Sequence, residues 1–345
     1  MKSVVKKIFN YLFILSVLGV AVGTTLGYMG TYYYVFELAS HFKLHLLLTG
    51  VILIPFVLYT KKRFLIVLTL LTFAVNVYEV APWYIKPVHA AEHVGEGFTL
   101  VSANVKFNSE NKNGLLSYIQ TVAPDIVFLQ ELDPKWSEVI NTLKETYHYS
   151  FIVDYGDEFG IGILSKFPLG NLYEINVMPF HSPSLEAIAT LDDGTRIKLI
   201  TIHPMPPISK ELFEHRNAMF EEVALRIKNS TEDVLLAGDF NTTMWSPQYK
   251  KLVSEAGLRN LSKGFGLHGT WPIGRANYTN FLNAKEGGKS GTDFIPSWLV
   301  YNHPIKLPID HVLVRGNIIV KNISAGPDIG SDHLPIMAEL QIPTK

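Results

Sequence analysis

The stretch Leu235-Leu236-Ala237-Gly238-Asp239-Phe240-Asn241 decides the fold of this chain. An apolar run leads into a glycine, which is followed by a carboxylate and an amide two residues apart. Residues i and i+2 of an extended chain lie on the same face, so Asp239 and Asn241 are expected to point together beyond the end of a strand. A carboxylate beside an amide suits a metal-bound phosphate, although a Gly-Asp-Phe-Asn sequence also forms ordinary turns.

The same arrangement recurs along the chain. Strand-like apolar runs begin or end in a polar side chain that can bind a metal, hold an anion or move a proton at Asn104, Glu131, His203, Asp239, Asp310 and His333. Catalytic side chains tend to lie where rigid elements end. Six such positions in one chain indicate a single shared site rather than six incidental surface groups.

Seven segments resemble the endonuclease/exonuclease/phosphatase superfamily in their residues and in their order along the chain. This superfamily includes deoxyribonuclease I-like enzymes, abasic-site endonucleases, neutral sphingomyelinases and inositol-polyphosphate 5-phosphatases. The segments are Ser102–Val105, Pro124–Glu131, Ile163–Pro168, Ile202–Pro204, Gly238–Asn241, Ile309–Val312 and Ser331–His333. The resemblance covers residues 98–340. It implies an α/β fold, a four-layer α/β/β/α sandwich of two mixed sheets, and it is less specific for the substrate.

The resemblance also implies a divalent metal. Glu131 matches the main Mg²⁺ ligand of the family, Asn104 supports it, and Asp332 could reach the metal. Oxygen ligands suit a hard cation, so Mg²⁺ is expected, with Mn²⁺ as a substitute. Zinc is disfavoured because the chain has no cysteine, the usual ligand of structural zinc sites. Lys106 stands where some relatives carry a second acid, which weakens the case for a second metal on that side.

Five residues take catalytic roles by the same resemblance. Asp239 would orient or deprotonate the attacking water, and Asn241 would hold a phosphate oxygen. His333 would contact the phosphate or transfer a proton, with Asp310 fixing its tautomer and charge as in hydrolase triads. His203 matches a second family histidine that contacts the phosphate or the leaving group.

Charge is distributed unevenly along the 345 residues, although the net charge is only −1. Residues 1–63 hold seven basic residues and one acidic residue, a balance of +6. After residue 81 the chain holds 23 of its 30 basic and 29 of its 31 acidic residues, a balance of −6. An acidic catalytic region is poorly matched to long-range attraction of duplex DNA, which needs Lys and Arg to displace counterions.

Three apolar runs precede the acidic region, at residues 8–36, 44–60 and 64–81. A span needs about 20 apolar residues, so the last two are at the short end. A buried hairpin or a signal sequence is the alternative, but a signal peptide is not followed by two more apolar runs. Residues 1–81 are therefore expected to form a multi-pass anchor in the cell membrane. The chain is accordingly identified as a membrane-anchored, bacterial-type member of the superfamily.

Basic residues predict the topology of this anchor. One cluster precedes the first run and Lys61-Lys62-Arg63 separates the second from the third, so three spans put both clusters on the same side. Because Lys and Arg stay inside, the region after the third span is expected outside the cytoplasm. An aromatic belt is expected at the outer face, from Tyr28, Tyr32, Tyr33, Tyr34, Trp83 and Tyr84. Glu79 is interpreted as an interfacial residue.

Residues 82–97 look like a linker, and residues 98–345 like the catalytic domain. Helices are expected at 113–122, at 134–147, after the N-cap Ser209, and from Ser246 to about Gly257. Strands are expected throughout 149–203, with a hairpin turn at 192–195.

His311, a strand neighbour of Asp310, is expected to be a surface or packing residue. The aromatic, irregular segment 264–308 is expected to border the site, although a packed structural excursion fits it equally well.

The sequence thus predicts a membrane-tethered, Mg²⁺-dependent phosphohydrolase that acts outside the cytoplasm. A phosphodiesterase or nuclease is the literal assignment, and the partners are a nucleic acid, phospholipid or phosphosugar substrate and the lipid bilayer. The anchor and the acidic domain favour a phospholipid or phosphosugar. A non-enzymatic extracellular binding module is a further alternative, and no protein partner is predicted. A chain starting near residue 90 is expected to be soluble.

Overall fold

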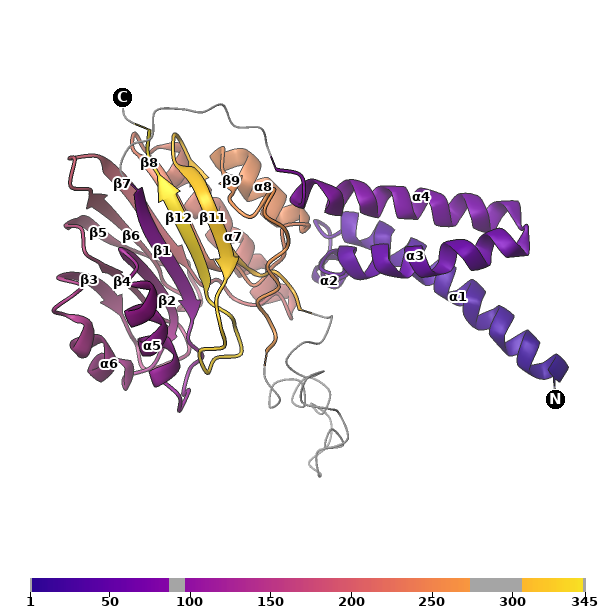
Figure 1. Cartoon of the computed structure of the whole chain (residues 1–345), viewed down its shortest axis with the longest axis horizontal. Coiled ribbons are helices and arrows are strands. Elements are labelled where there is room, and N and C mark those ends of the chain that lie inside the picture. Colours follow the sequence, from indigo (N-terminus) through magenta and orange to yellow (C-terminus); the bar gives the residue numbers. More distant parts are fainter. Residues whose placement is uncertain (1, 87–96, 274–305, 344–345) are drawn as a thin grey trace.

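Two six-stranded sheets packed face to face form the centre of the molecule (Figure 1). The computed structural model describes residues 2–86, 97–273 and 306–343. The first sheet has the order β11-β12-β1-β2-β4-β3. Its strands are β1 (Gly97–Asn104), β2 (Ile126–Leu132), β3 (Tyr149–Val153), β4 (Gly160–Ser165), β11 (Ile319–Ala325) and β12 (Ile336–Gln341). The second sheet has the order β5-β6-β7-β8-β10-β9. Its strands are β5 (Leu169–Ile175), β6 (Ser184–Thr190), β7 (Arg196–Ile202), β8 (Asp233–Asp239), β9 (Arg259–Asn260) and β10 (Asp310–Arg315).

Helices cover the outer face of each sheet, which confirms the four-layer sandwich. α5 (Asn113–Val122) and α6 (Trp136–Leu143) pack on the first sheet, and α7 (Lys210–Lys228) and α8 (Pro247–Ala256) pack on the second. α5 has the expected bounds. The helix expected at 134–147 is shorter because the chain turns after Leu143, and the buried Tyr147 then donates its hydroxyl to the Pro124 carbonyl at 2.8 Å.

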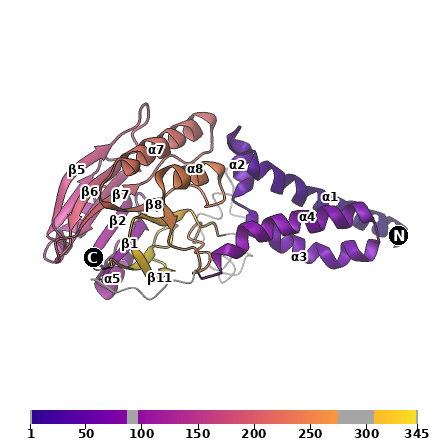
Figure 2. The same cartoon turned by 90° about the horizontal axis from the view of Figure 1, so that it is seen from above.

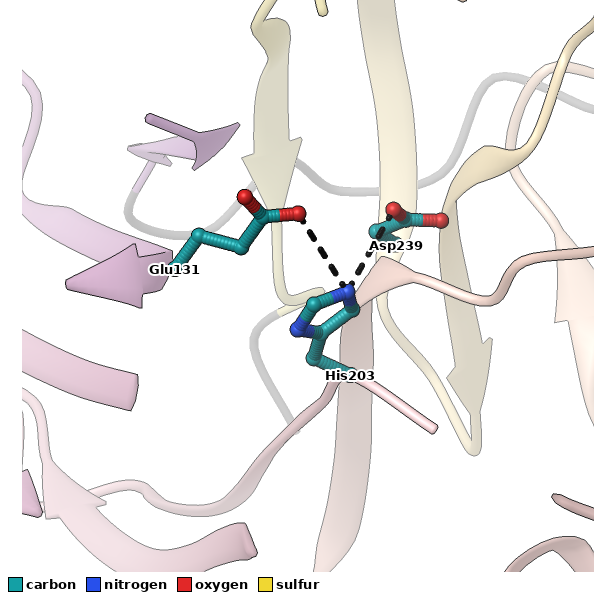
Figure 3. Close-up of side chains that lie close together, drawn as sticks. All are labelled: Glu131, His203 and Asp239. Atoms are coloured by element: carbon teal, nitrogen blue, oxygen red, sulfur yellow. Dashed lines mark ion pairs between the residues drawn. The ribbon is translucent and has the colours of Figure 1, made fainter. Parts of the chain in front are cut away.

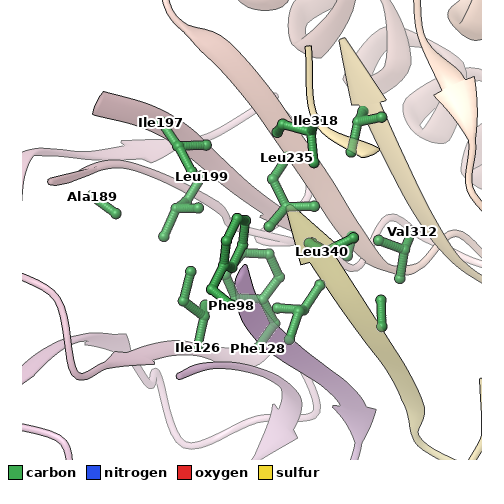
Figure 4. Close-up of a cluster of buried hydrophobic side chains, with 14 of the residues drawn as sticks. Phe98, Ile126, Phe128, Ala189, Ile197, Leu199, Leu235, Val312, Ile318 and Leu340 are labelled. Atoms are coloured by element: carbon green, nitrogen blue, oxygen red, sulfur yellow. The ribbon is translucent and has the colours of Figure 1, made fainter. Parts of the chain in front are cut away.

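The alternation of side chains along β8 places some of them in the core between the sheets and positions Asp239 at the end of the same face. Leu235 and Ala237 face the first sheet and join the inter-sheet core with Phe98 and Phe128, whereas Leu236 faces the helix layer (Figure 4). All five side chains are at most 2% exposed. The same two-residue period carries Asp239, two residues beyond Ala237, to the end of the inter-sheet face.

The predicted caps and turn are confirmed. Ser209 and Ser246 each accept hydrogen bonds from backbone N–H groups in the first turn of α7 and α8. α8 ends at Gly257, whose φ of 63° is left-handed. Residues 192–195 turn between β6 and β7, with Gly194 at φ 84°.

The N-terminal region forms a helical bundle beside the sandwich (Figure 2). Its elements are α1 (Lys2–Tyr28), α2 (Tyr34–Ser40), α3 (Lys43–Thr60), α4 (Arg63–Val80) and the 3-10 turn η1 (Ala81–Trp83). Three helical segments are long and apolar enough to cross a membrane by length and composition: Val4–Tyr28, Lys43–Thr60 and Arg63–Trp83.

The first apolar run, expected to be one span over 8–36, does not form one helix. α1 ends at Tyr28, and α2 folds back against it. Glycines permit this approach, because a Cβ on Gly27 would lie 3.0 Å from the Ser40 Cα and a Cβ on Gly30 would lie 2.8 Å from the Glu37 Cα.

The bundle has a distal and a proximal end. The N-terminus and the turn between α3 and α4, which holds Lys61 and Lys62, lie at the end far from the sandwich (Figure 1). The end of α4, and α2, lie against the sandwich (Figures 1 and 2). Both basic clusters are therefore at the same end of the bundle, opposite the catalytic domain.

Polar contacts join the proximal end to the catalytic domain. Glu37 of α2 forms a fully buried ion pair with Arg216 of α7, with 2.6 Å between Oε2 and Nη2. Glu79 of α4 pairs with Lys250 of α8 at 2.8 Å, and the Glu79 carbonyl accepts a hydrogen bond from the Trp245 indole at 3.0 Å. The described part of the expected linker also packs on the domain, since the Trp83 carbonyl accepts hydrogen bonds from the backbone N–H groups of residues 264 and 266.

Candidate active site

Two parallel strand pairs bring the predicted residues to one edge of the sandwich. β1 runs parallel to β2 and β7 runs parallel to β8. Asn104 and Glu131 lie at the carboxyl end of the first pair, His203 follows β7, and Asp239 ends β8. Asp310 opens β10 directly opposite Asp239. The carboxyl ends of parallel strands are where ligands bind in α/β folds.

Glu131 occupies a bulge rather than the plain end of β2. The register against β4 shifts between Gln130 and Leu132, and Glu131 has a φ of 61°. A left-handed backbone at a residue other than glycine costs about 1–3 kcal/mol and is typical of functional sites. The bulge turns the carboxylate towards the second sheet (Figure 3), where Oε1 accepts a hydrogen bond from Asn104 Nδ2 at 2.7 Å and Oε2 accepts one from the Phe107 N–H at 2.9 Å.

Asp239 is the central carboxylate and is only 1% exposed. Its Oδ1 accepts a hydrogen bond from the Asn241 N–H at 2.8 Å, and its Oδ2 accepts one from Asn104 Nδ2 at 3.2 Å. Burial raises the pKa of Asp239 to about 6, and the charge of His333 opposes this rise. A carboxylate with such a pKa suits proton exchange near neutral pH.

His333 and Asp310 form the predicted imidazole–carboxylate pair. His333 Nδ1 lies 2.9 Å from Asp310 Oδ2, and His333 Nε2 lies 3.6 Å from Asp239 Oδ2. Burial by itself lowers the pKa of His333, but the adjacent Asp310 and Asp239 carboxylates outweigh burial and raise it to about 10. The imidazole is therefore a cation held between two carboxylates.

His203 reaches into the site from the other side. Its Nε2 lies 3.7 Å from a carboxylate oxygen of Glu131 and 3.7 Å from one of Asp239 (Figure 3). These separations are too long for direct hydrogen bonds and leave room for a ligand atom between the three side chains. The His203 carbonyl accepts a hydrogen bond from Ser182 Oγ at 2.6 Å, which fixes the backbone at this position.

Two overlapping groups of side chains could hold a metal ion. The ligand atoms of Glu131, His203 and Asp239 lie within 4.8 Å of one another, and so do those of Asp239, Asp310 and His333. The Asp310–His333 hydrogen bond engages the second group internally, so the first group is the better metal site. Two carboxylates and an imidazole around a shared space fit a divalent cation with several retained waters.

The other predicted ligands lie differently. Asn104 presents its amide nitrogen to Glu131 and Asp239, while its oxygen accepts a hydrogen bond from the Lys106 N–H at 3.0 Å. Asn104 thus orders both carboxylates in this arrangement. Asp332 belongs to neither group, although its charge contributes to the raised pKa of His333.

Two of the remaining predicted residues can be placed as well. Asn241, with a φ of 49°, donates its amide to the Pro204 carbonyl at 2.9 Å and so ties the loop after β8 to the loop after His203. His311 is a packing residue, as expected. It lies between Phe240 and Tyr249, with ring centroids 5.2 and 4.8 Å away.

Further residues support the site without having been assigned a role from the sequence. The Phe107 N–H acts through its backbone, which composition does not reveal. Ser331 donates its hydroxyl to the Asn104 carbonyl at 2.7 Å and accepts a hydrogen bond from the His333 N–H, so it joins the two halves of the site. Trp271 lies with its ring centroid 6.4 Å from that of His333. The described part of segment 264–308 therefore borders the site, as expected, and residues 274–305 lie outside the described part of the chain.

Comparison with known proteins identifies the family of the chain. The model of the Endonuclease/Exonuclease/phosphatase family matches residues 101–333. Tyrosyl-DNA phosphodiesterase 2 of Danio rerio is 28% identical over 141 residues, which cover 39% of this chain and 37% of that protein. The matched stretch thus spans well under half of that relative.

Solved structures share the fold. TDP2 of D. rerio complexed with a single-strand DNA product has a TM-score of 0.54 and 21% identity, covering 71% of this chain and 99% of that one. An endonuclease/exonuclease/phosphatase of Beutenbergia cavernae has a TM-score of 0.54 and 15% identity, covering 72% of each chain. The human Nocturnin catalytic domain has a TM-score of 0.50 and 16% identity, covering 71% of this chain and 94% of that one.

The fold and the buried acid–histidine site define a metal-dependent hydrolase of phosphoric esters. The chain belongs to the Endonuclease/Exonuclease/phosphatase family.

Proposed function

We propose that this protein is a membrane-anchored, Mg²⁺-dependent phosphodiesterase whose catalytic domain faces outside the cytoplasm, with Mn²⁺ able to replace Mg²⁺. One observation carries the proposal. Glu131 and Asp239 converge from two different sheets on a space bordered by His203, beside a histidine cation held by Asp310. Phosphoester cleavage needs charge neutralisation, an activated water and a proton for the leaving oxygen, and these residues can supply all three.

The side chains divide this work by their environments. Glu131, with Asp239, would hold the cation, whose charge polarises the phosphoryl group. Asp239, which lies between the cation position and His333, would orient or deprotonate the attacking water. His333, held charged by Asp310, stabilises negative charge on the phosphoryl oxygens or donates its Nε2 proton. His203 and Asn241 would orient the phosphate, His203 from its position beside Glu131 and Asp239.

The primary substrate candidate is a phosphodiester of nucleic acid, by analogy with the D. rerio relative and its structure with a DNA product. A phospholipid or phosphosugar is the second candidate. It is favoured by the acidic balance of the chain after residue 81 and by the apolar bundle packed against the domain. A binding module without activity is not retained, because Glu131, Asp239, Asp310, His203 and His333 all meet at the site.

The test uses the full chain in detergent with Mg²⁺, Mn²⁺, Ca²⁺ or EDTA. The substrates are single-stranded and duplex DNA, 5′-tyrosyl DNA, RNA, sphingomyelin, phosphoinositides and bis-p-nitrophenyl phosphate. We expect hydrolysis that Mg²⁺ and Mn²⁺ support and EDTA abolishes. Undiminished turnover in EDTA would overturn the metal assignment. Turnover of lipids alone would select the second candidate.

The topology has its own test. A reporter active only after export is fused at Lys345, alongside a second fusion to a reporter active only in the cytoplasm. We expect the exported signal, because both basic clusters lie at the bundle end opposite the domain and basic residues remain inside. A cytoplasmic signal would reverse the topology and favour nucleotides or nucleic acid as substrates.

A further inference from the structure

A cavity of about 800 Å³ lies where the anchor meets the catalytic domain, away from the acidic site. Its walls come from the end of α4 and η1 on one side and from α8 and β9 on the other. The apolar part of the lining includes Trp83, Ile85, Trp245, Val253 and Leu258. Ligand cavities have volumes of about 300–1,000 Å³, are mostly apolar and often lie at domain interfaces, and this one has all three properties.

The polar part of the lining is mainly basic. It includes Lys250, Arg259 and Lys263 against one acid, Glu79. Glu79 is already neutralised, because Lys250 Nζ lies 2.8 and 2.9 Å from its two carboxylate oxygens. Among the described residues, Arg259 and Lys263 form no ion pair, and the Arg259 guanidinium donates instead to the Gly316 and Ile318 carbonyls. The cavity is therefore positive in a region of the chain whose overall balance is acidic.

The floor of the cavity is preformed. Asn260 Nδ2 donates to the Tyr249 hydroxyl at 2.6 Å, and the Asn260 carbonyl oxygen of the side chain accepts from the Ser262 N–H at 2.8 Å. Tyr249 is buried and stacks near His311. A rigid floor lowers the entropy that a ligand must overcome on binding.

The position of the cavity, at the end of a candidate membrane span, indicates the class of ligand. Trp83 closes the candidate span Arg63–Trp83, and tryptophan and tyrosine concentrate where a bilayer meets water. A cavity at that level meets lipid headgroups through its polar side and acyl chains through its apolar side. Basic side chains in such a cavity attract the anionic phosphate of a headgroup.

We propose that this cavity binds one anionic phospholipid of the surrounding bilayer, with its phosphate at Arg259 and Lys263 and an acyl chain along Trp83 and Trp245. The inference rests on the proposed insertion of the bundle in a membrane. It is separate from the catalytic chemistry, because none of the cavity residues belongs to either group of candidate metal ligands.

The test compares lipid retention by the full chain and two double variants. Arg259→Gln with Lys263→Gln removes the proposed phosphate contacts. Lys135→Gln with Lys144→Gln removes the same charge from exposed positions at the two ends of α6, on the opposite sheet. Each protein is reconstituted in phosphatidylcholine nanodiscs that contain an increasing fraction of phosphatidylglycerol. It is then extracted gently, and native mass spectrometry measures the mass of the intact protein with its bound lipids.

We expect the wild type and the Lys135/Lys144 variant to retain one phosphatidylglycerol. The Arg259/Lys263 variant should need a roughly 30-fold higher phosphatidylglycerol fraction. This follows from about 1 kcal/mol per basic residue at an anionic surface and 1.4 kcal/mol per tenfold change in affinity. The proposal would be overturned if the two double variants retained equal amounts of phosphatidylglycerol. It would also be overturned if the wild type retained as much phosphatidylcholine as phosphatidylglycerol.

Two further arms separate this proposal from its premise. Flotation with neutral liposomes tests membrane insertion alone: a protein that floats but shows no preference for phosphatidylglycerol refutes the lipid site and leaves the anchor intact. A protein that does not float refutes the membrane premise of the proposed function. Soluble glycerol 3-phosphate is added to the detergent-solubilised protein as a competitor without acyl chains. If glycerol 3-phosphate bound at the same concentration as the lipid, the ligand would be a free phosphate compound. That result would overturn the proposal.

Discussion

Replacement of Glu37 by Ala should destabilise the catalytic domain, although Glu37 belongs to α2 of the N-terminal bundle. The Glu37 carboxylate and the Arg216 guanidinium are both fully buried and lie 2.6 Å apart. The same carboxylate also accepts hydrogen bonds from Ser246 Oγ and, at 3.4 Å, from Thr242 Oγ1. Its removal leaves a buried cation without its counter-ion and two hydroxyls without their acceptor.

Removal of one partner from a buried ion pair costs about 3–5 kcal/mol, because the remaining charge stays desolvated. A domain has a free energy of unfolding of about 5–15 kcal/mol, so the loss is a large share of the total. We expect this loss of stability to affect the active site as well. Residues 240–246 follow Asp239 and lead to the N-cap of α8, which is Ser246. We expect lower thermal stability and lower kcat together.

The assay is thermal and urea unfolding of the full chain in detergent, followed by tryptophan fluorescence, with hydrogen exchange of peptides covering residues 240–250. The matched control is Glu214→Gln, which removes an exposed carboxylate from α7. An exposed pair contributes about 0–1 kcal/mol, so this variant should resemble the wild type.

A double variant makes the test sharper. Glu37→Leu with Arg216→Met replaces both charges by apolar groups of similar length, and such exchanges are often neutral or stabilising. We therefore expect the double variant to be more stable than Glu37→Ala alone. A Glu37→Ala variant within 1 kcal/mol of the wild type would refute the reasoning. So would a double variant whose loss equals the sum of the losses of the Glu37→Leu and Arg216→Met single variants.

Three other expectations concern the site. Glu131→Gln should abolish Mg²⁺ binding measured by calorimetry while circular dichroism stays native, and turnover within tenfold of wild type at saturating Mg²⁺ would contradict the assignment. His333→Ala should lower kcat by about 10² to 10⁴, and Asp310→Asn should add little to it because it acts through the same imidazole; multiplicative losses would break the pair. Burial lowers the pKa of His311 to about 4, so the unfolded chain binds its proton first as the pH falls. The stability contributed by neutral His311, about 3 kcal/mol, is present above pH 6.5 and is lost between pH 6.5 and 4. His311→Gln should remove that part of the pH dependence, and an unchanged stability profile would count against it.

Most residues proposed for the site from the sequence meet at one edge of the fold, because strand ends and polar residues are local signals. Asn104, His203, Asp239 and Asp310 all end or begin strands, and parallel pairing brings such ends to one edge without further information. The caps at Ser209 and Ser246 are also local, since they depend on the hydrogen bonds of a single helical turn.

Backbone conformation was beyond the reach of sequence patterns. Glu131 was expected at a plain strand end, yet it occupies a left-handed bulge that only its contacts with Asn104 and Phe107 stabilise. The orientation of the Asn104 amide likewise depends on the Lys106 N–H, which itself requires the left-handed Lys106 backbone. These features arise from tertiary contacts, which a strand or turn propensity does not contain.

The function of α2 could not be predicted either, for a related reason. Residues 8–36 read as one apolar run, and the break after Tyr28 arises because Gly27 and Gly30 let α2 fold back. Glu37 then meets Arg216, which is 179 positions away in the chain. A chain starting near residue 90, expected from sequence to be soluble, would leave Arg216 without this partner, so the structure argues that it folds less stably than the full chain.

The docking of α2 also limits where the substrate can be in the proposed orientation. Thr243 Oγ1 lies 3.1 Å from His41 Nδ1, just beyond the end of α2. Thr243 is four positions after Asp239, and four extended steps along the chain reach at most about 14 Å. The catalytic carboxylate is therefore held within roughly 15–20 Å of the anchor by a loop that the Glu37–Arg216 pair fixes. A headgroup layer is about 5–8 Å thick, so the active site would face the water immediately above the bilayer. A phosphodiester at the membrane surface can reach this position directly. A long duplex would have to lie beside a domain of acidic balance, with few Lys and Arg residues to displace its counterions. Proximity and charge therefore favour a surface-bound or short, flexible substrate over extended duplex DNA.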